Sequence, residues 1–185
     1  LAILRNAGVA VPKAGTLPPV ERRATPEEAY RLIPDNIRNV LGWEGIPSTY
    51  GILARRPVEQ AQPHGAKGLY FYRTLGGALR NRHNTSIYEV IPKARQFRVH
   101  VAAGRTRTRE VLAGPEAQIA HRTGPRVVWN LENGYTYRVP TDGHIPPKVV
   151  PIAVQAVAAL AYDFGAVDIV TTDGVHGVDG AAFVL

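Results

Sequence analysis

Strand-like segments fill most of the chain after residue 68, and one helical segment interrupts them. Apolar runs bounded by turn residues are typical of strands. The expected strands are residues 69–73, 86–91, 96–101, 107–112, 126–131, 166–170 and 181–185. Residues 151–164 are rich in alanine, with apolar residues near helical spacing, and predict a helix. This order of elements predicts an α+β fold with a mostly antiparallel sheet.

Local signals mark three further features. Thr25-Pro26-Glu27-Glu28 combines an N-cap, a proline at the first helical position and a glutamate three residues after the cap. We therefore expect a helix from there to about Ile33. Asn133-Gly134 lies between two strand-like runs and predicts a type I′ hairpin turn. Residues 9–19 contain three prolines and predict an extended connection.

Composition limits the class of protein. The chain has 185 residues, 45% hydrophobic content and a mean hydropathy of −0.12, which is enough apolar material for a buried core. It has no cysteine, which excludes disulfides, thiol nucleophiles and thiolate metal sites. The longest apolar stretch, residues 149–160, is too short for a membrane span, which needs roughly 20 residues. No secretion signal is recognisable, so we expect a cytoplasmic protein with no membrane partner.

Charge is unevenly distributed along the chain. Residues 1–54 carry a net charge of +1, residues 55–109 carry +10 and residues 110–185 carry −4. Of the 22 basic residues 18 are arginine, whose planar fork binds phosphate or carboxylate through two hydrogen bonds, although a GC-rich genome also explains arginine in place of lysine. A basic middle followed by an acidic end favours a cleft that holds a polyanion and a metal cation.

Two basic segments are candidates for phosphate contact. Arg55-Arg56 precedes a small-residue loop, His64-Gly65-Ala66-Lys67-Gly68, that could close over phosphates or be an ordinary surface loop. Arg105, Arg107 and Arg109 alternate along a predicted strand and so form a one-sided row. That row suits phosphate or nucleic acid, or is a solvated face.

Polar residues also interrupt two apolar strands. Gln96, Arg98 and His100 lie on one face of their strand, either above a ligand or towards solvent. Asp168 lies within an apolar strand, where a carboxylate must be paired or bound to a cation. The histidines show no zinc-ligand spacing, and no nucleophile motif occurs.

The order of these pieces resembles the ATP-grasp superfamily, particularly its small bacterial and phage carboxylate–amine ligases. The resemblance covers some 130 residues, from about Arg55 to Leu185. It rests on the strings ILARRPVEQAQPHGAKGL, YEVIPKARQFRVHVAAG, VVWNLENGYTYR, ALAYDFGAVDIV and AAFVL. It implies two α+β lobes with mostly antiparallel sheets and a nucleotide between them. The expected domains are an N-terminal segment, 1–50, a small lobe, 51–91, and an incomplete larger lobe, 92–185.

The resemblance also implies roles for individual residues. The ATP-binding residues would be Arg55, Arg56, His64, Lys67, Glu89, Ile91 and Gln96, and the family usually has glutamate in place of Gln96. Arg98 would be the catalytic residue at the γ-phosphate or acyl phosphate. Asp168 would be a ligand of Mg²⁺. The family's remaining metal ligands, in an E-x-N string, would follow Leu185, so we expect a piece of a longer protein or an incomplete relic.

The implied activity is ATP-dependent amide-bond formation through an acyl phosphate, with ATP and Mg²⁺ as cofactors. The expected partners are small-molecule or peptide carboxylates and amines, and nucleic acid is not expected. Two alternatives stay open. One is a non-enzymatic structural or virion-associated protein of the same ancestry. The other is a basic nucleic-acid-binding domain that uses the Arg105, Arg107 and Arg109 row.

Overall fold

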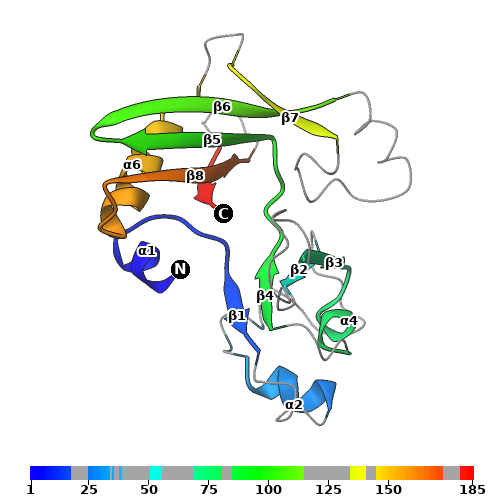
Figure 1. Cartoon of the computed structure of the whole chain (residues 1–185). Helices are drawn as coiled ribbons and strands as arrows, with labels where there is room; N and C mark the ends of the chain where they lie inside the picture. Colours follow the sequence, from blue (N-terminus) through cyan, green and yellow to red (C-terminus); the bar gives the residue numbers. More distant parts are fainter. Residues whose placement is uncertain are drawn as a thin grey trace, which may run out of the picture. The chain divides into compact units, whose positions relative to one another are not determined.

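The chain divides into two compact units in the computed structural model (Figure 1). One unit is Leu1–Val11 with Pro92–Leu185, and the other is Pro12–Ile91. The segment predicted as an N-terminal domain, residues 1–50, is thus divided between the units after Val11. The structure describes residues 1–17, 25–33, 35, 38, 51–55, 69–80, 85–114, 134–140, 145–172 and 180–185.

The 12–91 unit is built on a four-stranded antiparallel sheet. In sheet order its strands are β1 (Ala14–Thr16), β4 (Ser86–Glu89), β2 (Ile52–Arg55) and β3 (Leu69–Tyr72). Its described helices include α2 (Pro26–Arg31) and α4 (Leu75–Arg80). Ile33, Ile52, Leu75 and Ile87 are at most 1% exposed and form the centre of its core.

The capping box predicted for α2 is confirmed. The Thr25 hydroxyl accepts a hydrogen bond from the Glu28 backbone N–H at 3.2 Å. The Glu28 carboxylate accepts one from the Thr25 backbone N–H at 3.1 Å. These two bonds satisfy backbone N–H groups at the helix start that have no partner within the helix.

The larger unit has a five-stranded antiparallel sheet with α6 (Val149–Ala159) packed on one face. In sheet order its strands are β7 (Tyr135–Arg138), β6 (Arg105–Ala113), β5 (Arg95–Ala102), β8 (Phe164–Thr171) and β9 (Ala182–Val184). The short helix α1 (Ala2–Asn6) contributes Leu4 to the same core.

Alternation along β5 and β8 separates the two faces of this sheet. Phe97, Val99 and Ile169 are fully buried and pack with Val149 and Ala153 of α6. Residues directly opposite each other in an antiparallel pair lie on the same face. The intervening positions, including Gln96, Arg98 and His100 of β5, therefore lie on the face away from α6.

The predicted α+β class with mostly antiparallel sheets is confirmed. The helix expected over 151–164 was placed too late at both ends, because it begins at Val149 and ends at Ala159. Ala161 has a positive φ of 54°, which breaks the helix, and Phe164 already begins β8. The strand expected over 126–131 lies outside the described residues. None of the helices described is long and apolar enough to cross a membrane.

Candidate functional site

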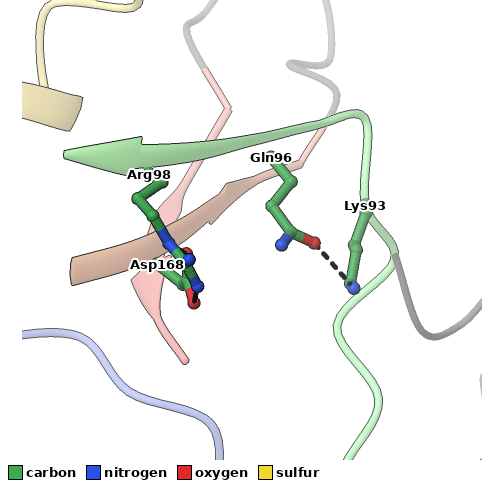
Figure 2. Close-up of polar contacts among 4 residues, drawn as sticks. All are labelled: Lys93, Gln96, Arg98 and Asp168. Carbon is green, nitrogen blue, oxygen red and sulfur yellow. Dashed lines mark hydrogen bonds and ion pairs between the residues drawn. The ribbon is translucent and has the colours of Figure 1, made fainter. Parts of the chain in front are cut away.

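The larger unit gathers polar side chains on the sheet face opposite α6. Arg98 of β5 lies directly across from Asp168 of β8, and Gln96 lies across from Val170. Figure 2 shows the side chains of Arg98 and Asp168 pointing towards each other, with Gln96 beside them and Lys93 in the segment before β5. Four residues from two chain segments about 70 positions apart thus form one site.

Arg98 and Asp168 form a two-pronged ion pair. Nε of Arg98 donates to Oδ1 of Asp168 at 2.8 Å, and Nη2 donates to Oδ2 at 2.7 Å. The two side chains are 36% and 30% exposed, so a ligand can reach the pair from solvent. Hydrogen bonding to Asp168 raises the pKa of Arg98 further above its ordinary value. The isolated carboxylate of the apolar strand is therefore paired with a cation.

The ring of Tyr137, in β7, contacts the guanidinium of Arg98. The guanidinium carbon of Arg98 lies 4.8 Å from the centre of the Tyr137 ring, a cation–π contact. Burial raises the pKa of the Tyr137 phenol, and the nearby Asp168 carboxylate raises it too. Arg98 is therefore held between a carboxylate and an aromatic face.

Gln96 and Lys93 form the second polar contact. Gln96 is only 4% exposed, and its Oε1 accepts a hydrogen bond from Nζ of Lys93 at 3.0 Å. Burial lowers the pKa of Lys93 from 10.5 to about 8, although the Asp168 carboxylate opposes this shift. Lys93 was not singled out from the sequence, where the available signal was a lysine three residues before Gln96, within one of the strings that carry the resemblance.

The remaining predicted site residues belong to the 12–91 unit or lie outside the described part. Glu89 ends β4, and its Oε1 accepts a hydrogen bond from the Lys13 backbone N–H at 2.7 Å. Arg55 is exposed at the end of β2, and Ile91 is 8% exposed. Arg56, His64 and Lys67 are outside the described residues.

Among the described residues of the sheet, Asp168 supplies the one carboxylate on this face. Both oxygens of Asp168 accept hydrogen bonds from Arg98. Within the described ranges, no three histidine, aspartate or glutamate side chains come together as a metal cluster. Mg²⁺ commonly binds through one or two carboxylates together with substrate phosphates. Asp168 therefore fits as one such carboxylate beside a bound phosphate.

Comparison with solved structures identifies the fold. D-alanine–D-alanine ligase from Bacillus anthracis matches all of this chain with a TM-score of 0.59 and 12% identity. The macrocyclase MdnC from Microcystis aeruginosa MRC, bound with precursor peptide MdnA, matches all of it with a TM-score of 0.55 and 14% identity. The ATP-grasp ligase PsnB, complexed with minimal precursor, Mg and ADP, gives a TM-score of 0.56 at 15% identity.

These matches confirm the ATP-grasp fold. The chain spans about half the length of these proteins: 53% of the D-alanine–D-alanine ligase, 50% of MdnC and 46% of PsnB. No protein-family model matches the sequence, and a search of curated proteins found no match.

Proposed function

We propose that the chain is part of an ATP-dependent carboxylate–amine ligase, in which the sheet face of Gln96, Arg98 and Asp168 binds the nucleotide. Two independent lines support this. The fold is that of ATP-grasp ligases. The face combines a guanidinium, a second cation and a partly exposed carboxylate, which are the groups needed to hold phosphates and a divalent metal.

The ion pair of Arg98 with Asp168 carries the proposal. Its guanidinium already presents two aligned donors to two oxygens, the geometry that a terminal phosphate also offers. The pair is about one-third exposed, so an incoming phosphate can compete for Arg98. Asp168 is then released and becomes available to a cation. We infer that nucleotide binding exchanges this ion pair for Arg98–phosphate and Asp168–Mg²⁺ contacts.

The other roles follow the resemblance. Gln96 would bond a ribose hydroxyl, and Glu89 with the backbone near Ile91 would contact the adenine. Arg55, Arg56, His64 and Lys67 would contact the phosphates. Lys93 adds a cation beside Gln96. A bound phosphate would stabilise the charged form of Lys93 and so raise its pKa above about 8.

The reaction needs no nucleophile from the protein. A substrate carboxylate attacks the γ-phosphorus of ATP, and the bond from that phosphorus to the β,γ-bridging oxygen breaks. ADP departs, and the substrate becomes an acyl phosphate. An amine then attacks the acyl carbon, inorganic phosphate departs, and the amine loses a proton as the amide forms. Mg²⁺, when bound, would neutralise phosphate charge. Arg98 would orient the transferred phosphoryl group and stabilise the charge that develops on it.

A peptide is the favoured source of the carboxylate or the amine. MdnC and PsnB were both solved with precursor peptides. Their likeness to this chain is in fold, and that likeness is what favours a peptide substrate.

Thermal unfolding with and without nucleotide tests the proposal. At a concentration of Mg-ATP about 100 times its Kd, binding should stabilise the folded chain by about 2.7 kcal/mol and raise the Tm by about 5–10 °C. Asp168→Asn and Arg98→Gln should each abolish most of this shift. Arg138→Gln removes an exposed arginine from the opposite face of the same sheet and should leave the shift intact. No shift in the unaltered chain would overturn the proposal.

A further inference from the structure

The row of arginines on β6 lies on the same sheet face as the proposed nucleotide site. Arg109 is directly opposite Arg98, Arg107 is opposite His100, and Arg105 is opposite Ala102. Opposed residues of antiparallel strands share a face, so the row continues outward from Arg98 on the side away from α6. We call Arg105, Arg107 and Arg109 the arginine strip.

Positive charge on this face is not balanced by the sheet itself. Of the acidic residues in the described strands of this sheet, Asp168 is on this face and is already paired with Arg98, whereas Glu110 is opposite Phe97 on the α6 side. Arg98 and Arg109 are directly opposite each other, and like charges in that position destabilise an antiparallel pair. No ion pair joins Arg105 or Arg107 to another described residue, and both are exposed. Arg105 and Arg107 are therefore accessible to an anion from outside, and Arg109 between them and Arg98 is partly exposed.

The spacing of the strip matches an extended peptide. Alternate residues of a strand are about 6.6–6.8 Å apart, and the acidic side chains on alternate residues of an extended peptide have the same separation. A peptide lying along β6 would keep one carboxylate beside each arginine without a change in register. The arginine fork binds each carboxylate through two hydrogen bonds.

An exposed aromatic residue lies at the outer end of the strip. Phe164 of β8 is opposite Ala102, which is in turn opposite Arg105, and the Phe164 side chain is 76% exposed. An apolar side chain of the peptide, placed after its acidic residues, could pack on Phe164 and remove apolar surface from water.

We propose that the arginine strip and Phe164 dock an acidic segment of an extended peptide substrate, with carboxylates on alternate residues. The inference rests on the proposed function, because the strip leads along the face to Arg98, where the reacting carboxylate would meet the γ-phosphate. It adds a binding surface for a part of the peptide that does not react.

Fluorescence anisotropy without nucleotide tests the strip directly. The probe is a fluorescein-labelled peptide, Glu-Ala-Glu-Ala-Glu-Ala-Phe, in which the phenylalanine shares a face with the glutamates. A matched peptide with glutamine in place of glutamate measures the charge dependence. The double variant Arg105→Gln, Arg107→Gln should bind the acidic peptide about tenfold more weakly, since two charge-assisted contacts are lost. Arg138→Gln, on the opposite face, should bind within about twofold of the unaltered chain.

Three outcomes would overturn the inference: equal binding of the acidic and glutamine peptides, unchanged binding by the double variant, or tighter binding of oligothymidylate than of the acidic peptide at the same salt concentration. The last outcome would indicate a nucleic-acid surface. The Tm shift with Mg-ATP separates the two proposals, because the double variant should retain it. If the unaltered chain shows peptide binding but no Mg-ATP shift, the docking surface stands while the ligase proposal fails.

Discussion

At the residue scale, the local sequence predicted which side chains mark the site but not which of them are partners. Alternation placed Gln96 and Arg98 on one face, and the isolated carboxylate of Asp168 required a counter-charge or a cation. That counter-charge is Arg98, 70 positions away. No local pattern encodes the pairing of β5 with β8, so the ion pair could not be predicted from either strand alone.

Asp168→Asn should destabilise the chain even without ligand. Arg98 would lose its charged partner while remaining near Tyr137 in a partly buried position. We expect the free energy of unfolding to fall by about 1–2 kcal/mol, between the values for exposed ion pairs and for buried charged hydrogen bonds. Urea denaturation measures this, and an unchanged midpoint would show that the pair contributes nothing to stability.

Lys93 should make stability depend on pH in alkaline solution. Its pKa is about 8 in the folded chain and 10.5 when exposed, so between these values the unfolded chain binds more protons. The Lys93 contribution therefore becomes more favourable to folding as pH rises through this window, and below pH 8 its burial penalty is fully present.

The difference in unfolding free energy between the unaltered chain and Lys93→Met isolates this effect. From pH 7 to pH 10, the unfolding free energy of the unaltered chain should rise relative to that of Lys93→Met by about 1–3 kcal/mol. In the unaltered chain, Lys93 donates to Gln96 at both pH values, because a neutral amine can still donate a hydrogen bond. The loss of this bond in Lys93→Met therefore lowers the unfolding free energy by a similar amount at each pH. A difference that does not change with pH would contradict the lowered pKa.

At the scale of elements, strong periodicity and turn chemistry predicted the strands around the site, and short elements were missed. The β5, β6 and β8 strands are each eight or nine residues long and contain the shorter strand-like runs predicted at residues 96–101, 107–112 and 166–170. The helices α1 and α4 have five and six residues, too few for a helical period to be distinguished. Packing determines them rather than local propensity: α1 packs against α6, and α4 packs against β2 and β3.

The β5–β6 turn offers a test of local backbone strain. Ala103 and Gly104 connect Ala102 to Arg105, with positive φ angles of 46° and 74°, the pattern of a type I′ turn. Alanine is disfavoured in this conformation and asparagine tolerates it. Ala103→Asn should therefore raise the free energy of unfolding by about 0.5–1 kcal/mol.

Gly104→Ala provides the opposite control. A Cβ at Gly104 would meet no atom within 4 Å, so only the backbone conformation opposes the substitution. It should lower the free energy of unfolding by about 1 kcal/mol. Urea denaturation measures both variants, and a destabilised Ala103→Asn would show that this turn does not favour asparagine.

At the scale of the whole molecule, the charged segments of the sequence do not coincide with the two structural units. The segment of +10 net charge, residues 55–109, belongs partly to the 12–91 unit and partly to the larger unit. The arginine strip and Arg98 come from this segment, whereas Asp168 comes from the segment of −4. Strand pairing brings both charges to one sheet face, and charge counts along the chain contain no information on that pairing.

Isothermal titration of the 185-residue chain with Mg-ATP tests the central claim most directly. We expect saturable binding with one site per chain, loss of the binding heat in Arg98→Gln and Asp168→Asn, and unchanged binding in Arg138→Gln. Absence of binding heat in the unaltered chain, or equal affinity in all three variants, would contradict the assignment of this sheet face as the nucleotide site.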